Sequence, residues 1–208
     1  MTKLLCSGLI AFEPMGVGHS QWSEMIAPSS CWLHPSVVIG MSEIEGRGLF
    51  AAQAIEVGLP VSRLGGSIVT DAELEVRFAQ QASDPTVGYI DTIAVGDGLH
   101  LLMPARQANH YGNHSCDPNL WWIDAFRLAA RRDIASGEEL TNDYGTSTGA
   151  PSFRMECRCG SPICRRFITG DDWRNRELRA RYGQHWVPEM LRLQSQSAES
   201  KTQATTEP

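Results

Sequence analysis

Three cysteines lie close together near the C-terminal end of the sequence, at Cys157, Cys159 and Cys164. Thiolates at this spacing can reach one centre, and a structural zinc site usually takes four ligands. The alternative is three reduced thiols in an ordinary loop. The candidates for a fourth ligand are the remaining cysteines, Cys6, Cys31 and Cys116. Cys116 has the most rigid context, because residues 117–119 are the turn formers Asp-Pro-Asn. A zinc site is therefore expected.

Three other segments also carry residues suited to chemistry. Residues 46–48 read Gly-Arg-Gly, a tight turn that lets the backbone approach a ligand, although taken alone the motif is better explained as a hairpin turn. Residues 112–119 read GNHSCDPN and gather polar turn formers around one histidine and one cysteine. Tyr144 ends a predicted strand before a glycine, which can place its hydroxyl in a pocket. The alternative for Tyr144 is a half-buried core position.

The segments that must position these residues read mostly as short strands. Strands are expected on both sides of Gly96-Asp97-Gly98, over 89–95 and 99–103, as a β-hairpin. Residues 120–130 read as strand, turn and strand, and 134–141 as a turn and a strand. Thr70 and Glu73 have the spacing of a capping box, which predicts a helix over 71–82. The expected fold class is mostly β (α+β).

The two ends of the chain look different from the middle. A helix is predicted over 171–183, with a further turn from Pro188 and a disordered polar tail after it. Residues 1–31 have no clear periodicity and fit a disordered extension. These boundaries divide the chain into an extension (1–31), a main domain (32–150), a cysteine element (151–170), a helical segment (171–193) and a tail (194–208).

Composition sets limits on function. The 208 residues carry a net charge of −6 at pH 7, which argues against direct nucleic-acid binding and is compatible with a basic peptide partner. The arginines of 174–181 fit the solvent-exposed face of the predicted helix. No apolar run is long enough to span a bilayer, and no secretion signal is recognised. A cytoplasmic protein is expected, with a nuclear, chromatin-associated location as the alternative in a eukaryote.

Taken in order, the segments EGRGLFA, GNHSCDPN, RRDIASGEELTNDYG and CRCGSPIC resemble the SET-domain family of protein lysine methyltransferases. The resemblance covers about residues 32–170. It implies a SET fold of small antiparallel sheets with a C-terminal pseudoknot that brings 112–119 beside 140–145. It also implies a post-SET zinc loop. In that loop the ligands would be Cys116, Cys157, Cys159 and Cys164.

The same resemblance implies S-adenosylmethionine-dependent methyl transfer to a lysine ε-amine of a protein or peptide. By matching positions, Tyr144 would be the catalytic residue that orients the amine. A tyrosine with its ordinary pKa of about 10 is protonated at neutral pH and is not a base. The positions that match the family's cofactor contacts are Gly46, Arg47, Gly48, His110, Tyr111, Asn113, His114, Tyr144 and Phe167.

The sequence departs from the family at a few positions. Asn142 stands where Phe or Tyr is usual, which favours mono- or dimethylation as the product. Leu64 replaces a common channel tyrosine, so Tyr89 or Phe126 is a candidate for that wall. His110 replaces an arginine. These departures support the alternative hypothesis, a catalytically weak, zinc-containing binding module with a SET-like fold.

Overall fold

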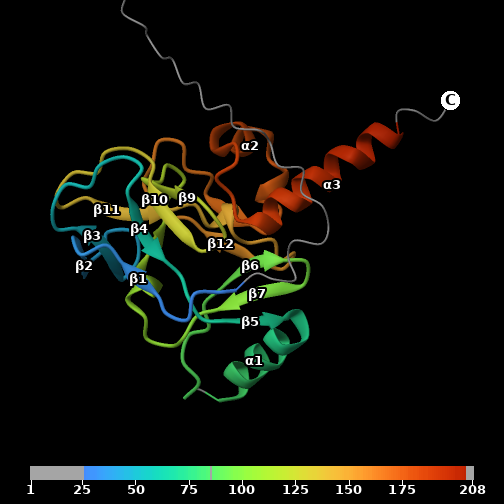
Figure 1. Ribbon diagram of the computed structural model, residues 1–208, viewed down its shortest axis with the longest axis horizontal. Coiled ribbons are helices and arrows are strands. Elements are labelled where there is room, and N and C mark those ends of the chain that lie inside the picture. The colour runs from blue at the N-terminus through green and yellow to red at the C-terminus, as the bar shows by residue number, and fades with distance from the viewer. Residues whose placement is uncertain (1–25, 85, 205–208) are drawn as a thin grey trace, which may run out of the picture.

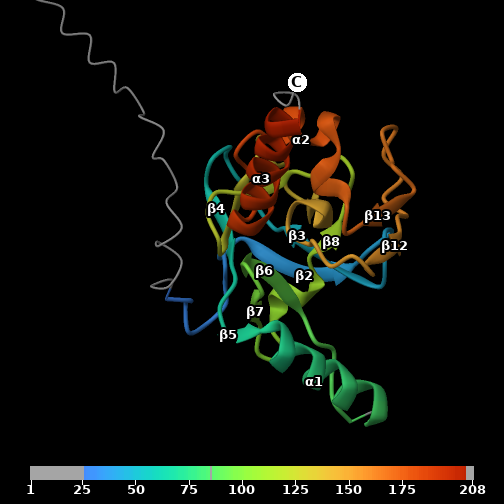
Figure 2. The ribbon, with the colours of Figure 1, turned by 90° about the vertical axis from the view of Figure 1, so that its right-hand side faces the viewer.

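The protein is described by a computed structural model over residues 26–84 and 86–204. Short strands form small, mostly antiparallel sheets in the body of the molecule (Figure 1). One helix lies at one end of this body, and two lie at the opposite end (Figure 2). In chain order these helices are α1 (Asp71–Ser83), α2 (Arg176–Tyr182) and α3 (Pro188–Ala204). The mostly-β prediction is confirmed.

Two four-stranded sheets make the larger part of the body. The first has the strand order β1 (Trp32–Leu33), β4 (Pro60–Arg63), β10 (Arg127–Ala130) and β9 (Leu120–Trp122). The second has the order β2 (Val37–Met41), β3 (Arg47–Ala51), β11 (Glu139–Asn142) and β8 (Asn113–His114). In the second sheet β8 and β11 run parallel, and the other neighbours run antiparallel. The strand–turn–strand prediction for 120–130 is confirmed by β9 and β10.

Two smaller sheets complete the strands. One has the order β5 (Ser67–Thr70), β7 (Leu99–Leu102) and β6 (Thr92–Gly96). Its β6–β7 pair is the predicted hairpin, and Gly98 at the turn adopts φ +64°, a left-handed conformation that favours glycine. The other sheet pairs β12 (Arg154–Glu156) with β13 (Phe167–Thr169). This last pair forms the base of the cysteine-rich loop.

The predicted capping box starts α1. The Thr70 hydroxyl accepts a hydrogen bond from the Glu73 backbone N–H, and the Glu73 carboxylate accepts one from the Thr70 backbone N–H. Together these bonds satisfy two backbone donors that have no partner within the helix. Leu74 is the buried residue of the helix, whereas Val76 and Phe78 face solvent. The helix ends at Ser83, one residue beyond the predicted end.

The C-terminal segment differs from its prediction in two places. Asn175 has an extended backbone, and its side chain caps α2 by accepting the Glu177 and Leu178 N–H groups. A single helix over 171–183 is therefore wrong, since a short 3-10 turn, η4 (Asp172–Arg174), precedes this cap. The predicted disordered tail is also wrong over 194–204, which α3 covers.

Burial in the core accounts for the first of these differences. Trp173, Leu178, Tyr182 and Trp186 are all buried in the same hydrophobic cluster as strand residues such as Leu140. Burying one large apolar side chain contributes about 1.5–3 kcal/mol. Tertiary packing therefore fixes η4, α2 and the start of α3, where Met190 is also buried. The polar composition of 194–204 gives little helix signal.

Part of the predicted N-terminal extension contacts the domain. The Gly66 N–H donates to the Pro28 carbonyl at 2.8 Å, and the Gly65 N–H donates to Cys31 Sγ at 3.3 Å. The ordered domain thus includes residues before Trp32. The remainder of the proposed extension, including Cys6, lies outside the described residues.

A substitution at Gly48 tests the packing of β3 against β11. A Cβ added at Gly48 would overlap the Glu139 carboxylate, which accepts hydrogen bonds from Ser42 and Asn113. We expect Gly48→Ala to lower the free energy of unfolding by about 1–3 kcal/mol, measured by urea denaturation. Gly88→Ala is the control, because its added Cβ meets no atom within 4 Å. Equal stability of the two variants would contradict this packing.

Candidate active site

The parallel β8–β11 pair brings two of the predicted motifs together. Asn113 pairs with Thr141, and His114 pairs with Asn142. The Asn119 side chain extends this pairing, since its Oδ1 accepts the Thr141 N–H at 2.9 Å and its Nδ2 donates to the Glu139 carbonyl at 2.8 Å. The expected adjacency of 112–119 and 140–145 is therefore present. Threading of the chain as a pseudoknot stays a prediction.

The Asn113 side chain fastens the glycine turn to β8. Its amide nitrogen lies 2.8 Å from Glu139 Oε1, 3.1 Å from the Arg47 carbonyl and 3.2 Å from the Glu45 carbonyl. Within the turn, Gly46 has φ +49°, and an added Cβ there would meet no atom within 4 Å. The Asn113 hydrogen bonds thus hold the turn on one side, and the Gly46 side of the turn is open to a ligand.

Other predicted cofactor residues lie beside this turn. The 3-10 turn η2 (Ala108–Tyr111) leads into β8. The Arg47 guanidinium carbon lies 4.8 Å from the centre of the Tyr111 ring, a cation–π contact. Gly46, Arg47, Tyr111 and Asn113 are therefore neighbours in space.

Phe167 has a different partner. Phe167 lies on β13 and is 43% exposed. The Arg154 guanidinium carbon lies 3.9 Å from the centre of the Phe167 ring. The Arg158 guanidinium, from the same cysteine-rich loop, lies 3.1 Å from Glu45 Oε2, next to the glycine turn. The cysteine-rich loop thus reaches the glycine turn through the Arg158–Glu45 ion pair. A cofactor contact by Phe167 stays a prediction.

The Tyr144 side chain is half-buried at the end of β11. Tyr144 opens the 3-10 turn η3 (Tyr144–Thr146), and its hydroxyl donates to the Gly112 carbonyl at 2.7 Å. Burial, followed by the negative charge of Asp91, raises the Tyr144 pKa well above its ordinary value. The phenol is therefore protonated at neutral pH and acts as a donor.

His114 is buried beside Tyr144 and is neutral. Its Nδ1 accepts the Tyr144 backbone N–H at 3.1 Å, and its Nε2 lies 3.4 Å from Cys116 Sγ. Burial lowers the His114 pKa to about 4, against the opposing charge of Asp143. Since both ring nitrogens have partners within the protein, the imidazole holds Tyr144 in place and is not a free base.

His110 faces an acidic residue that the sequence analysis did not select. Its Nε2 donates to the Pro104 carbonyl at 3.0 Å, and its Nδ1 lies 3.8 Å from Asp91 Oδ2. The Tyr89 ring meets the His110 ring edge to face at 6.0 Å between centroids. Burial raises the Asp91 pKa to about 6, although the charge of His110 opposes this. Of the two candidates for an aromatic wall, Tyr89 lies here, whereas Phe126 packs against the hydrophobic core.

The four predicted metal ligands meet at one point. The Sγ atoms of Cys116, Cys157, Cys159 and Cys164 all lie within 4.8 Å of one another. Two of them, in Cys116 and Cys157, are 3.8 Å apart. A tetrahedral zinc with Zn–S bonds of about 2.3 Å requires S–S separations of about 3.8 Å, so this cysteine cluster fits that ion.

The alternatives for the fourth ligand differ in position. Cys31 lies against the Gly65 backbone, and Cys6 is outside the described residues.

Burial raises the pKa of the Cys159 thiol, but N–H groups of Cys116 and Ser161 outweigh this effect and bring the pKa down to about 7. A thiolate at this position is suited to a metal ligand.

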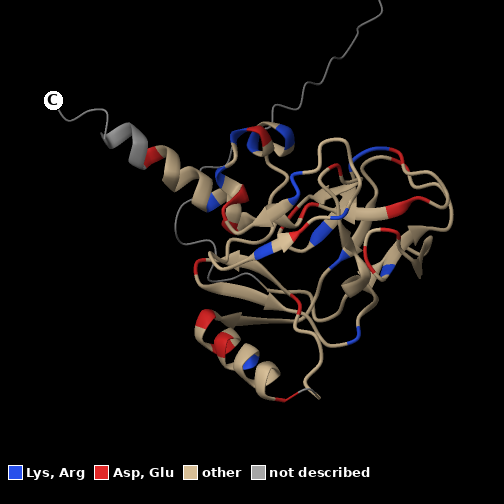
Figure 3. Cartoon of the chain, turned by 180° about the vertical axis from the view of Figure 1, so that it is seen from behind, with Lys and Arg blue, Asp and Glu red and all other residues tan. Residues whose placement is uncertain are grey.

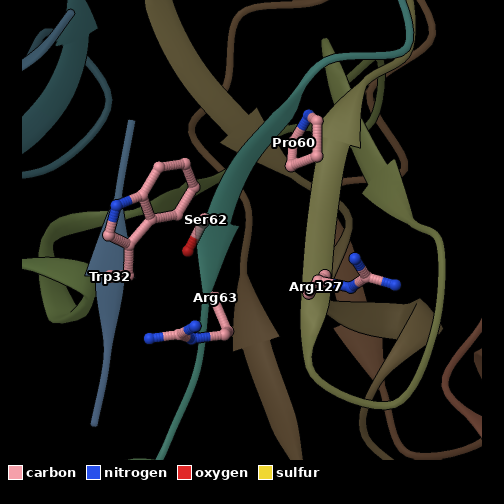
Figure 4. Close-up of a pocket in the computed structure, with 5 residues that line it drawn as sticks. All are labelled: Trp32, Pro60, Ser62, Arg63 and Arg127. Atoms are coloured by element: carbon pink, nitrogen blue, oxygen red, sulfur yellow. The ribbon is translucent and has the colours of Figure 1, made fainter. Parts of the chain in front are cut away.

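A separate hollow lies on the first sheet. Trp32, Arg63 and Arg127 occupy one row across β1, β4 and β10, and Pro60 and Ser62 complete the lining. Figure 4 shows the Arg63 and Arg127 side chains pointing away from each other. Because these two cations do not converge, they do not form a single anion site.

The SET domain family model matches residues 46–145, from the glycine turn to Gly145. The chain contains a SET domain. A solved structure titled the methyltransferase domain of human histone-lysine N-methyltransferase SETMAR matches with a TM-score of 0.52 and 26% identity. That match covers 66% of this chain and 58% of the human one.

Curated relatives of the SET domain agree with this assignment. Histone-lysine N-methyltransferase ash1 of Drosophila melanogaster is 32% identical over 152 residues, which are 70% of this chain and 7% of the relative. Histone-lysine N-methyltransferase SUV39H2 of Xenopus tropicalis is 29% identical over 149 residues, which are 59% of this chain and 36% of the relative. The SET-domain chain thus spans a minor part of these relatives. Among the helices described here, none is both long and apolar enough to cross a membrane.

Asp91 provides a pH test of this site in the SET domain. Its folded-state pKa is raised above the unfolded value, so the folded state binds the proton more tightly. Stability from this group is present at low pH and is lost as pH rises through about 6. We expect Asp91→Asn to increase the free energy of unfolding by about 1–2 kcal/mol at pH 8 and to change it little at pH 4. Urea denaturation at pH 8 and at pH 4 measures the free energy of unfolding. Lower stability of Asp91→Asn than of the parent at pH 8 would disprove the prediction.

Proposed function

We propose that this SET domain catalyses methyl transfer from S-adenosylmethionine to the ε-amine of a lysine in a protein or peptide. The observation that carries the proposal is the half-buried, protonated Tyr144. Its hydroxyl lies 2.7 Å from the Gly112 carbonyl, at the meeting point of β8 and β11. Relatives named histone-lysine N-methyltransferases support the same activity.

The residues around the glycine turn suit the methyl donor. The turn at Gly46–Gly48 offers a backbone whose open side carries no Cβ, and Arg47 and Tyr111 stack beside it. The residues proposed to hold the donor are Gly46, Arg47, Gly48, His110, Tyr111, Asn113, His114, Tyr144 and Phe167. When bound, S-adenosylmethionine supplies a methyl group on a positively charged sulfur.

The protein's own contribution is alignment. Tyr144 donates a hydrogen bond from a fixed phenol, and His114 fixes the Tyr144 backbone. Neither group is poised to accept a proton, so the lysine amine must react in its neutral form. A dry channel favours that form because burial lowers the pKa of an ammonium group. Correct alignment of two reactants can lower a barrier by about 7–11 kcal/mol.

The cysteine cluster is proposed to hold a structural zinc ion through Cys116, Cys157, Cys159 and Cys164. Its four sulfur atoms lie within 4.8 Å of one another, and one pair is 3.8 Å apart, as four-thiolate coordination requires. Cys116 belongs to the segment that ends β8, and the other three belong to the loop between β12 and β13. The ion would therefore fasten that loop beside His114 and the glycine turn.

The substrate is proposed to be a basic protein segment. The chain has a net charge of −6, and α1 carries three acidic residues, Asp71, Glu73 and Glu75, against one basic residue, Arg77 (Figure 3). Charge of this sign attracts a lysine-rich peptide and disfavours direct binding to nucleic acid. Histone-directed relatives make histones the first substrates to test and support a location at chromatin. The cytoplasmic location stays the alternative.

A methyl-transfer assay tests this function. The chain has only two lysines, Lys3 and Lys201, so a variant with both replaced by arginine gives no methylation of the enzyme itself. With methyl-labelled S-adenosylmethionine, we expect this variant to label lysine in histones or in a cell lysate. Binding of the donor by calorimetry without any labelling would favour the non-catalytic binding module, which the buried, non-aromatic Leu64 supports.

Substitution of the phenol tests its role. We expect Tyr144→Phe to lower kcat by about 100-fold, because the amine and methyl group lose the hydroxyl that orients them. The affinity for S-adenosylmethionine, measured by calorimetry, should stay close to that of the parent. Tyr89→Phe is the matched control, because Phe keeps the ring beside His110 and only the hydroxyl of an exposed residue is lost, and it should lose far less activity. Parent-like turnover of Tyr144→Phe would remove Tyr144 from the mechanism.

Removal of the metal tests the cysteine cluster. We expect chelation to weaken S-adenosylmethionine binding by about tenfold, or about 1.4 kcal/mol, because the loop that reaches the glycine turn would lose its anchor. Metal analysis before and after chelation should give one zinc per chain and then none. Unchanged affinity after complete loss of zinc would refute the link between the two sites.

A further inference from the structure

Arg165 connects the cysteine cluster to a buried carboxylate. It directly follows Cys164, and its backbone N–H donates to Cys116 Sγ at 3.3 Å. Its guanidinium meets Asp143 with both arms, each at 2.7 Å from one carboxylate oxygen. The Asp143 side chain is 1% exposed and that of Arg165 is 15% exposed. This bidentate, buried pair fixes both the distance and the direction between the two chain segments.

The C-terminal segment takes part in the same network. Asp172, in η4, accepts a third bond from the Arg165 guanidinium at 2.9 Å. Tyr182, in α2, donates its hydroxyl proton to Asp143 Oδ2 at 2.8 Å. Residues beyond the cysteine cluster therefore hold the Arg165–Asp143 pair through largely buried contacts rather than through a surface ion pair.

Asp143 is in turn joined to the candidate active site. It directly precedes Tyr144, and its Oδ1 accepts the Gly145 N–H at 3.0 Å, which starts the turn that carries the phenol. A second route runs from Cys116 Sγ to His114 Nε2, and from His114 Nδ1 to the Tyr144 N–H. Tyr144 thus lies between two hydrogen-bonded connections that both begin at the cysteine cluster.

We propose that Arg165 is a positioning residue that couples the cysteine cluster to the placement of Tyr144, with Asp172 and Tyr182 as parts of the coupling. The Arg165 guanidinium is the cation that contacts both oxygens of the buried Asp143 carboxylate. A buried carboxylate that loses its partner must move toward another donor or toward water. The Asp143–Thr146 turn moves with it, and so does the phenol. The kinetic consequence of this coupling rests on the proposed function.

Matched variants separate this role from general stability. Arg165→Lys keeps the charge and loses the two-armed geometry. Asp172→Asn keeps the Arg165–Asp143 pair and removes the second carboxylate, so it is the milder change. The controls are the adjacent Arg166→Lys and Asp171→Asn, since Arg166 is exposed and Asp171 forms only a surface pair with Arg174. Each variant must first melt cooperatively, and if Arg165→Lys does not, Asp172→Asn decides.

The first readout follows Tyr144 directly and needs no activity. The chain has four tyrosines, so fluorine NMR of protein labelled with 3-fluorotyrosine gives few signals, and Tyr144→Phe identifies the one from Tyr144. We expect that signal to shift in Arg165→Lys and Asp172→Asn and to stay in place in both controls. Removal of zinc should shift it in the parent protein, and by less in Arg165→Lys, where the coupling is already weakened.

The second readout is kinetic. A misplaced phenol should lower kcat by about 10- to 100-fold in Arg165→Lys, with the KM for the peptide nearly unchanged. A Tyr144 signal and a kcat that match the parent in both test variants would overturn the proposal, even if the enzyme is active. A shifted Tyr144 signal in a parent protein that transfers no methyl group would instead support the coupling and reject the proposed function.

Discussion

Two residue pairs, Asn113 with Thr141 and His114 with Asn142, join β8 to β11 in parallel. This pairing brings two distant sequence motifs into one site, because it sets the Gly112 carbonyl opposite the Tyr144 hydroxyl. It also carries Cys116 from the end of β8 to the cysteine-rich loop. The Asn119 amide adds hydrogen bonds to the β11 backbone and so lengthens a pair of very short strands. The other features of the site depend on this register.

The electrostatics of the site favour fixed donors over proton exchange. His114 is neutral because it is buried, and burial also keeps the Tyr144 phenol protonated. The buried carboxylate of Asp143 is compensated by Arg165 rather than by the imidazole. A site with these protonation states orients a reacting amine and does not take up its proton. This agrees with methyl transfer, in which alignment supplies much of the rate enhancement.

Sequence reasoning was accurate where the signal is local. The capping box of Thr70 and Glu73 and the hairpin at Gly98 each depend on residues a few positions apart, and both are present. It failed over 171–183, where Asn175 starts a new helix, and over 194–204, where polar residues form the end of α3. Asp143 lies inside the motif RRDIASGEELTNDYG, and Arg165 lies next to Cys164. Neither residue was predicted to belong to the site. Their roles come from a contact between segments far apart in the chain.

The sequence by itself determined the type of chemistry: a glycine turn, a tyrosine at a strand end and three closely spaced thiols, in an order that resembles one family. These features follow from residue identity and short spacing, which local backbone preferences translate directly. Only the tertiary structure decided that Cys116 and not Cys31 joins the cluster, and that Arg165 faces Asp143. Contacts of this kind depend on how buried strands and helices pack against one another. A buried charge is stable only where this packing places its partner beside it.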